Sequence, residues 1–438
     1  MGRLTAGLDL RSGPHGGWPI SAGQNELTRR LDVAWLREAP LRDLLAALEA
    51  AGEEARVVGG AVRNAILGEP HGDVDIATTA QPDEVIRQVE AAGFKAVPTG
   101  VEHGTVTVIA AGRPFEVTTL REDVETFGRR AKVAFGRDWR RDAERRDFTM
   151  NALSLSRDGT AHDYVGGLDD IEARRVRFIG EPATRIAEDY LRILRFFRFH
   201  AAYGQGAADP EGLAACVAAR AGLEQLSRER VRMEVLKLLV ARHAVPALAL
   251  MTETGLLEQV LGGVPLLASY ANMIKLEAAF ALAPDAVRRL GALGILVVED
   301  AERLRERLRL TNAEYERLVS MGEGWWQISA SWSEREARVL LYRLGGARFT
   351  DRMLLAWTRA PQGERDQAWH QLAALPSRWS VPVFPLKAAD FIARGVPRGP
   401  ALGAALAAAE EAWIAADFPA DAPAVAALAD AAAAAQTR

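Results

Sequence analysis

Two aspartates stand two residues apart in the sequence Gly-Asp-Val-Asp-Ile at residues 72–76. The apolar residues around them predict a β-strand, and since strand side chains alternate, both carboxylates leave one face close together. Like charges this close repel unless a cation lies between them, and clustered carboxylate oxygens suit Mg²⁺. Asp73 and Asp75 are therefore candidate metal ligands, although the same spacing also occurs at turn edges and on solvated strand faces.

A glycine pair lies just before the aspartates. Residues 57–58 predict an apolar strand, Gly59 and Gly60 a tight turn, and residues 64–68 a helix that closes at a further glycine. Backbone N–H groups at such a turn and at the N-terminus of a helix can hold phosphate, although many glycine pairs are only tight turns. The order of the two motifs decides the interpretation: phosphate binding beside a carboxylate pair indicates phosphoryl or nucleotidyl transfer.

A third carboxylate, Glu116, lies in the apolar and β-branched run Phe-Glu-Val-Thr-Thr-Leu at residues 115–120. If this run pairs beside the strand with Asp73 and Asp75, Glu116 completes a three-carboxylate cluster that can hold two metal ions. If it does not, Glu116 is a glutamate that faces water on an edge strand.

Arginines and an aspartate follow at residues 145–147. Arg146 and its neighbour can clamp a phosphate, and Asp147 can accept a hydrogen bond from a ribose hydroxyl; a surface salt-bridge cluster is the alternative. The preceding residues 121–141 are charged, broken by glycine and poor in apolar anchors. They predict a mobile loop, which either closes over a bound nucleotide or is simply solvated.

The most distinctive helical pattern spans residues 187–199. Arg192, Arg195 and Arg198 recur every three residues along one broad face, and Asp189 lies one turn before the first of them. A carboxylate that accepts from an exocyclic amine and a guanidinium that donates to a ring nitrogen or carbonyl can together read cytosine or adenine. An exposed i,i+3 salt bridge is the alternative. We favour base reading because the arginines follow the phosphate-transfer residues.

Length and composition limit the class of protein. The 438 residues suffice for about two to four domains, and a net charge of −4 argues against a generally basic nucleic-acid coat protein but not against a local basic groove. The single cysteine, Cys216, excludes an intrachain disulfide framework and a cysteine metal cluster. No apolar run approaches the roughly 20 residues that cross a bilayer, so we expect no membrane partner and a cytoplasmic protein.

The fold class that these patterns predict is α+β. Short β-branched runs alternate with helical patterns and form a mixed sheet, at residues 55–58, 73–78, 94–97, 104–110, 114–120 and 150–156. Beyond about residue 181 the periodicity is helical, with breaks near residues 204–206, 262–265, 345–347 and 379–385 and an alanine-rich end that predicts helix to about residue 416. The predicted domains are a disordered extension (1–30), a catalytic head (31–165), a helical neck (166–260) and a helical body with a tail (261–438).

Five motifs across about residues 55–200 resemble those of the class II tRNA nucleotidyltransferases, the bacterial CCA-adding enzyme and poly(A) polymerase branch of the polymerase-β-like superfamily. In order they are Val-Gly-Gly-Ala-Val-Arg (58–63), Gly-Asp-Val-Asp-Ile-Ala-Thr (72–78), Glu-Val-Thr-Thr (116–119), Arg-Arg-Asp-Phe-Thr-Met-Asn-Ala (145–152) and Glu-Asp-Tyr-Leu-Arg (188–192). The resemblance implies a polymerase-β-like head with a helical neck, body and tail. It also implies template-independent addition of CCA to tRNA 3′ ends from CTP and ATP.

The resemblance further implies a role for each matching residue. Asp73 and Asp75 correspond to the catalytic metal-binding pair, and Glu116 to the third acidic residue of that cluster. The implied contacts with the nucleotide are Gly60 and Arg63 to the triphosphate, Arg146 to the nucleotide and Asp147 near the ribose. Asp189 and Arg192 would serve as the protein template for C and A. Arg195 and Arg198 would support the base and the phosphates.

The expected cofactor is Mg²⁺, and the expected partners are CTP, ATP and the acceptor and TΨC arms of tRNA, held through phosphates and shape. Asn64 departs from the family, which usually has Asp there, and weakens any ion pair that orients Arg63. Four activities share these motifs: complete CCA addition, CC-only addition, A-only addition and poly(A) synthesis. Residues 99–108 resemble the corresponding segment of the CCA-adding members. A non-catalytic RNA-binding relative is the alternative from another class, but it has no reason to keep a repulsive aspartate pair. The oligomeric state stays open.

Overall fold

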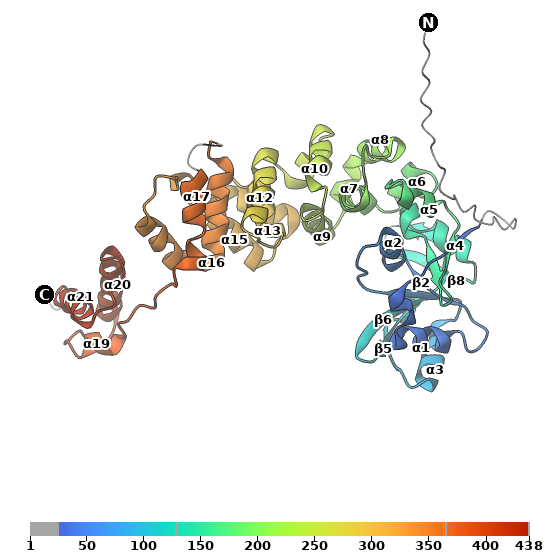
Figure 1. Cartoon of the computed structure of the whole chain (residues 1–438), viewed down its shortest axis with the longest axis horizontal. Coiled ribbons are helices and arrows are strands. Elements are labelled where there is room, and N and C mark those ends of the chain that lie inside the picture. The colour runs from blue at the N-terminus through green and yellow to red at the C-terminus, as the bar shows by residue number, and fades with distance from the viewer. Residues whose placement is uncertain (1–25, 128–129, 362, 364–365, 437–438) are drawn as a thin grey trace, which may run out of the picture. The chain divides into compact units, whose positions relative to one another are not determined.

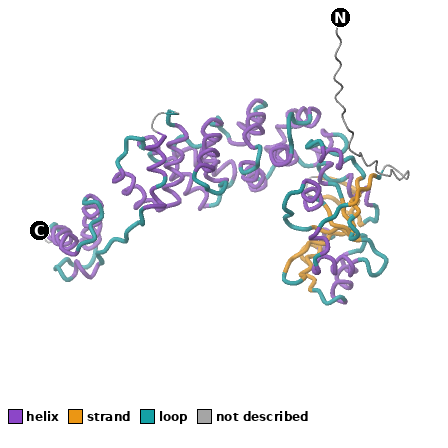
Figure 2. Tube along the Cα trace, viewed as in Figure 1, coloured by secondary structure: helices purple, strands orange, loops and turns teal. Residues whose placement is uncertain are grey.

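The computed structural model describes residues 26–127, 130–361, 363 and 366–436. The chain divides into two compact units, Met1–Gln225 and Leu226–Arg438. Among the described residues, all strands belong to the first unit and the second is helical, as the colours of Figure 2 show. The predicted α+β fold class is therefore confirmed.

A mixed eight-stranded sheet forms the centre of the first unit (Figure 1). Its strands are β1 (Leu27–Arg30), β2 (Ala55–Val58), β3 (Asp75–Thr78), β4 (Lys95–Gly100), β5 (Thr105–Ala110), β6 (Arg113–Thr119), β9 (Ser154–Ser156) and β10 (Thr160–Asp163). The order is β1-β10-β9-β2-β3-β6-β5-β4, and β3 and β6 run parallel to each other. The predicted hairpin is present, since β5 and β6 are antiparallel and joined by Ala111 and Gly112.

The two faces of the sheet have different surroundings. Helices α1 (Ala39–Leu48) and α3 (Pro82–Ala91) pack on one face, onto β2, β5 and β6. Val57 and Ile76 are fully buried, while their strand neighbours Val58 and Ala77 pack with Trp139 on the opposite face. Because strand side chains alternate, every second residue of β3 and β6 points to that opposite face.

The turn after β2 depends on glycine. Gly59 has a φ of +71°, which a side chain would strain, and α2 (Gly60–Leu67) begins directly after it. The helix ends at Gly68 in the left-handed conformation, as predicted. The other helices of this unit are η1 (Ala34–Arg37), η2 (Val101–His103), α4 (Trp139–Glu144), η3 (Thr149–Asn151), α5 (Gly167–Glu172), α6 (Pro182–Glu188), α7 (Leu191–Tyr203), α8 (Pro210–Ala218) and η4 (Arg220–Gln225).

Two segments that the sequence predicts to be irregular form strands. Leu27–Arg30 is part of the predicted disordered extension but pairs as β1 with β10; residues 1–25 lie outside the described residues. The predicted loop at 121–141 instead contains the antiparallel pair β7 (Arg121–Phe127) and β8 (Arg130–Phe135), with residues 128–129 outside the described residues. Both segments lack a clear apolar alternation, and backbone pairing does not require one.

Two predicted elements are shorter or broken. The strand expected at 150–156 is the helix η3 followed by the three-residue strand β9. The helix expected over residues 187–199 is interrupted, because Asp189 is extended between α6 and α7. The Asp189 carboxylate accepts the backbone N–H of Leu191 at 3.1 Å, so it supports the start of a new helix instead of continuing the old one.

The second unit is a succession of helices. They are α9 (Arg228–Leu239), α10 (Ala244–Glu253), α11 (Leu256–Leu261), α12 (Leu267–Ala279), α13 (Ala286–Gly294), α14 (Val298–Leu308), α15 (Asn312–Gly322), η5 (Trp325–Gln327), α16 (Glu334–Arg359), α17 (Asp366–Ala373), α18 (Leu375–Arg378), α19 (Ala388–Ile392), α20 (Pro400–Ala415) and α21 (Ala422–Ala434). The predicted breaks separate α11 from α12 and α18 from α19, and Gly345 kinks α16. In the described part of the chain, no helix is long and apolar enough to span a membrane.

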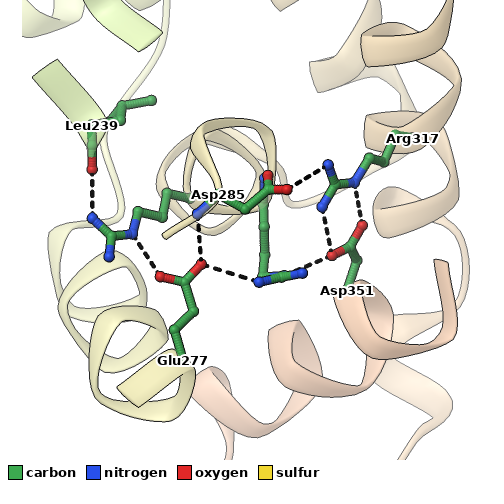
Figure 3. Close-up of polar contacts among 7 residues, drawn as sticks. Leu239, Glu277, Asp285, Arg317 and Asp351 are labelled. Atoms are coloured by element: carbon green, nitrogen blue, oxygen red, sulfur yellow. Dashed lines mark hydrogen bonds and ion pairs between the residues drawn. The ribbon is translucent and has the colours of Figure 1, made fainter. Parts of the chain in front are cut away.

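A cluster of charged side chains, most of them buried, lies among four helices of the second unit (Figure 3). Glu277 of α12 accepts from Arg289 at 2.7 Å and from Arg288 at 3.2 Å. Asp351 of α16 accepts from Arg288 at 2.7 Å and also from Arg317 of α15. Glu277 and Asp351 are 1% and 0% exposed. With Asp285, which also accepts from Arg317, three carboxylates meet three guanidinium groups, so the buried charges balance.

Candidate active site

The predicted aspartate pair lies at the start of β3. Asp73 and Asp75 are exposed and Val74 between them is buried, so the two carboxylates share one face as the spacing predicts. Asp75 lies opposite Val58, the last residue of β2. The carboxylates are thus held at the end of β2, beside the glycine turn.

Glu116 lies next to this pair. The parallel register places Ile76 beside Val117, so Asp75 is level with Glu116 on strands that lie about 4.8 Å apart. Both side chains are exposed on the same face. Desolvation, followed by the negative charges of Glu116 and Asp73, raises the pKa of the Asp75 carboxyl, while Arg146 opposes that rise. The strand pairing on which the third carboxylate depends is therefore confirmed.

This arrangement fits a divalent cation. Besides desolvation, the negative charges of Glu116 and Asp73 act on Asp75, and a cation beside Asp75 would offset their repulsion. As the side chains stand in the described part of the chain, no set of three His, Cys, Asp or Glu residues is drawn together tightly enough to hold a metal ion. The fit therefore rests on hard oxygen donors on neighbouring strands, which is the donor set that Mg²⁺ prefers.

A pocket of about 220 Å³ connects the carboxylates to a group of arginines. Asp75 and Glu116 line one part of it, and Arg121, Arg145 and Arg146 line another. Guanidinium groups bind phosphate oxygens, and carboxylates bind the cation that accompanies them. Arg145 and Arg146 would therefore hold a polyphosphate in this pocket, and Asp75 and Glu116 would hold the cation that accompanies it.

Asp142 orients two of these arginines. Its carboxylate, 3% exposed, accepts from Arg145 Nε at 2.8 Å and from Arg146 Nη2 at 3.2 Å. Burial opposes ionisation of Asp142, yet Arg146 and Arg145 outweigh it and lower the pKa of this carboxyl. Asp142 is not among the predicted site residues, although its i,i+3 and i,i+4 spacing to the arginines was a usable signal.

The glycine turn approaches Arg146 closely. A Cβ on Gly59 would lie 3.5 Å from Arg146 Nη1, and a Cβ on Gly60 would lie 3.5 Å from Arg63 Nη2. The turn therefore lies between two guanidinium groups, at the N-terminus of α2. This placement is compatible with the predicted contact between Gly60 and a phosphate.

Arg63 does not face the pocket. Its side chain is 5% exposed, and Nη1 donates to Asn151 Oδ1 at 2.6 Å while Nη2 donates to the Tyr203 hydroxyl at 2.7 Å. Nε and Nη2 also donate to Asn64 Oδ1, at 3.1 and 2.9 Å. Burial lowers the pKa of this guanidinium. This placement of Arg63 therefore does not support its predicted contact with the triphosphate.

Asn64 gives the first prediction for mutagenesis. Its oxygen accepts from Arg63, and its Nδ2 donates to the carbonyl of Pro70 at 2.8 Å. Asn64→Leu removes both contacts and leaves buried N–H groups unpaired, so we expect a loss of about 2–3 kcal/mol in the free energy of unfolding. Asn64→Asp gains an ion pair and loses only the bond to Pro70, so a change below about 1 kcal/mol is expected. Urea unfolding of both variants checks this; equal stabilities would contradict it.

Asp147, predicted to lie near a ribose, is instead occupied by protein groups. Its carboxylate, 9% exposed, accepts from Arg195 Nε at 2.7 Å, from Asn151 Nδ2 at 3.1 Å and from the N–H of Phe148 at 2.8 Å. It therefore connects the segment after α4 to α7.

The same carboxylate predicts an acid dependence of stability. Burial opposes ionisation of Asp147, but Arg195 and the hydrogen bonds outweigh it and lower the pKa. The unfolded chain then binds more protons, so the contribution of Asp147 is complete above about pH 4 and is lost as pH falls through the lowered pKa. Unfolding titrations between about pH 2 and 5 should show this loss in the wild type and a shallower loss in Asp147→Asn. Equal slopes would contradict it.

The arginines of α7 contact different partners. Arg192 donates to the Glu188 carboxylate and, at 2.6 Å, to the carbonyl of Arg185. Arg195 forms an ion pair with Asp147. The Arg198 guanidinium lies 4.2 Å from the centre of the Phe199 ring. Asp189 and Arg192 remain neighbours, since the Arg192 N–H donates to the Asp189 carbonyl at 3.0 Å. The predicted pair is thus brought together at the start of α7, but not as one turn of a continuous helix.

The sequence is similar to those of several known proteins. Residues 55–177 match the family described as "Poly A polymerase head domain", and residues 208–270 match the "Probable RNA and SrmB- binding site of polymerase A". The Danio rerio protein "CCA tRNA nucleotidyltransferase 1, mitochondrial" is 42% identical over 268 residues, which are 60% of this chain and 61% of that protein. The Homo sapiens protein of the same name is 35% identical over 351 residues, 78% of this chain and 79% of that protein.

A solved structure extends the likeness. The Bacillus stearothermophilus CCA-adding enzyme, crystallised with CTP, is 30% identical with a TM-score of 0.67 and matches 87% of this chain and 94% of its own. The match with the Danio rerio protein spans less than two thirds of that protein, but those with the human protein and the bacterial structure span more. The chain belongs to the CCA tRNA nucleotidyltransferases, the family of the CCA-adding enzymes.

Proposed function

We propose that the chain adds CCA to tRNA 3′ ends, transferring CMP from CTP and AMP from ATP and releasing pyrophosphate. The observation that carries this is the placement of Asp75 and Glu116 side by side on parallel strands, in one pocket with Arg145 and Arg146. A pocket with a metal-binding end and a phosphate-binding end suits nucleotidyl transfer. The family's CCA-adding members supply the substrate class.

The carboxylates form the metal-binding end. Asp73 and Asp75 hold divalent ions, with Glu116 beside them, and Mg²⁺ is the ion that an all-oxygen donor set favours. When bound, Mg²⁺ supplies charge neutralisation at the attacking 3′-hydroxyl and at the leaving pyrophosphate. A cation at this end would offset the repulsion that Glu116 and Asp73 exert on Asp75.

The arginines form the phosphate-binding end. Asp142 holds Arg145 and Arg146 in fixed positions. These side chains therefore lose little conformational entropy when the nucleotide binds. The N–H groups at Gly60 and the start of α2 add donors for a phosphate oxygen. Asp147 and Arg63 are buried beside this end and support it without contacting the nucleotide directly.

Asp189 and Arg192 are the proposed protein template for the base. A carboxylate and a guanidinium at the start of one helix can accept from the amine of cytosine or adenine and donate to the adjacent ring nitrogen. Arg195 and Arg198 follow on the same helix and support its position. Reading the base from a helix start keeps the template close to the head, since Arg195 is fastened to Asp147.

The partners are tRNA, CTP and ATP. We assign the binding of the acceptor and TΨC arms to the helical part, with a neck at 166–260 and a body and tail at 261–438. The compartment proposed is the cytoplasm, although three relatives bear the word mitochondrial in their names.

The test uses purified protein, Mg²⁺ and tRNA transcripts that lack the terminal CCA. Separate reactions receive CTP alone, ATP alone, or both, and product length is measured at single-nucleotide resolution. We expect growth by two residues with CTP and by three with both. Growth by two residues with CTP alone and no further growth with both nucleotides would indicate CC-only addition. A long ladder with ATP would indicate poly(A) synthesis, and no growth would favour a non-catalytic RNA-binding protein.

A further inference from the structure

A chain of hydrogen bonds, buried in its middle, begins and ends on helix α7. Tyr203, its last residue, accepts from Arg63 Nη2 at 2.7 Å, and Arg63 Nη1 donates to Asn151 Oδ1 at 2.6 Å. Asn151 Nδ2 donates to Asp147 Oδ1 at 3.1 Å, and Asp147 Oδ2 accepts from Arg195 Nε at 2.7 Å. Arg195 and Tyr203 are eight residues apart, about 12 Å along the helix, so α7 is fastened at two points.

The side chains in the middle of this chain are buried. Arg63, Asn151 and Asp147 are 5%, 8% and 9% exposed. Asn151 is suited to its place, because one neutral side chain offers an oxygen to a cation and an N–H to an anion. This fixes the orientation of the amide and makes each partner depend on the next.

Aromatic contacts add to the fastening at the end of α7. The Arg63 guanidinium lies 3.8 Å from the centre of the Tyr203 ring and 5.4 Å from that of Phe199. The Tyr203 ring can therefore hold Arg63 through its π-face while the hydroxyl accepts an N–H. Removing the hydroxyl alone leaves the stacking and tests the hydrogen bond.

The fastened helix carries the proposed template at its other end. Asp189 and Arg192 lie at the start of α7, while Arg63 belongs to α2, which follows the turn beside the carboxylates. The hydrogen-bond chain thus joins the helix that carries the base-reading groups to the helix that begins beside the metal-binding groups. Displacement by about 1 Å in such a geometry is sufficient to change rates strongly.

We propose that Asn151 and Tyr203 are positioning residues that set where the base-reading end of α7 lies relative to Asp73 and Asp75, and thereby determine how well the enzyme discriminates between nucleotides. The inference rests on the proposed function. Neither residue lines the pocket of the candidate active site, and each acts through Arg63 and Asp147. A purely structural role predicts lower stability with unchanged discrimination, which separates the two explanations.

The experiment measures kcat/KM for CTP, ATP and UTP on tRNA lacking CCA, and for ATP and CTP on tRNA ending in CC. Tyr203→Phe leaves one N–H of a buried guanidinium unpaired, so we expect the preference for the correct nucleotide to fall by about fivefold to tenfold. Asn151→Asp places a carboxylate against Asp147 and should reduce it further. All assays run below the measured melting temperature of each variant.

Tyr270→Phe is the matched control. The Tyr270 hydroxyl is buried in the second unit and donates to the carbonyl of Leu239 at 2.7 Å, so its loss costs stability away from α7. We expect wild-type discrimination in this variant. Wild-type discrimination in Tyr203→Phe would overturn the inference, whereas failure of the wild-type protein to extend tRNA would overturn the proposed function instead.

Discussion

Replacing Asp75 with Asn is expected to slow nucleotide addition by about a thousandfold or more while the head stays folded. The change removes a negative charge from the metal-binding pair, and a bound divalent ion supplies several kcal/mol of transition-state stabilisation, with about 1.4 kcal/mol for each factor of ten in rate. Asp75 is exposed, so an amide fits without repacking. Desolvation, followed by repulsion from Glu116 and Asp73, raises the pKa of Asp75. Because a neutral amide avoids both costs, stability should equal or exceed that of the wild type.

The measurement is a single-turnover rate of CTP addition, together with thermal unfolding. Asp73→Ala should behave in the same way. Glu90→Gln is the matched control, since Glu90 is exposed on α3, which packs on the other face of the sheet, and its rate should be that of the wild type. Near-full turnover in Asp75→Asn would contradict the assignment, as would a loss of activity that follows unfolding.

Replacing Asp351 with Ala is expected to destabilise the second unit by about 3–5 kcal/mol. Asp351 is 0% exposed and accepts from Arg288 at 2.7 Å and from Arg317 (Figure 3). Without it, one buried and one partly buried guanidinium lose a carboxylate, and the cluster is left with an excess positive charge. Asp351→Asn keeps an acceptor and should cost less than Asp351→Ala.

Tryptophan fluorescence during urea unfolding can follow this effect, because seven of the ten tryptophans lie after residue 226. The control is Glu411→Ala. Its carboxylate pairs with Arg343 at 2.7 Å at the surface, with both side chains at least half exposed, so its loss should cost below about 1 kcal/mol. Equal losses for Asp351→Ala and Glu411→Ala would show that burial does not determine the contribution of these ion pairs.

Much of the catalytic end could be predicted from the sequence because its signals are local. The period-two spacing of Asp73 and Asp75 predicted one shared face, and the β-branched run around Glu116 predicted a strand that does pair beside β3. The glycines at 59 and 68 marked the turn and the helix end by their need for positive φ.

The rest depends on contacts between distant residues, which no local pattern encodes. Arg63 has the spacing of a phosphate ligand, yet it donates a hydrogen bond to Tyr203, 140 residues later in the sequence. Asp147 has the sequence position of a ribose acceptor, but its carboxylate accepts a hydrogen bond from Arg195 instead. The break at Asp189 was a local signal that the arginine periodicity outweighed, since a short polar side chain before a helix serves as a cap.

The dependence of tRNA extension on divalent metal tests the central claim most directly. Purified protein is freed of metal with EDTA, and extension of a transcript lacking CCA, with CTP and ATP present, is then followed as Mg²⁺ is added back. The carboxylate site predicts no extension without metal and addition of three residues with it. Equal extension in both conditions would contradict metal-dependent transfer, and no extension in either would contradict nucleotidyl transfer by this chain.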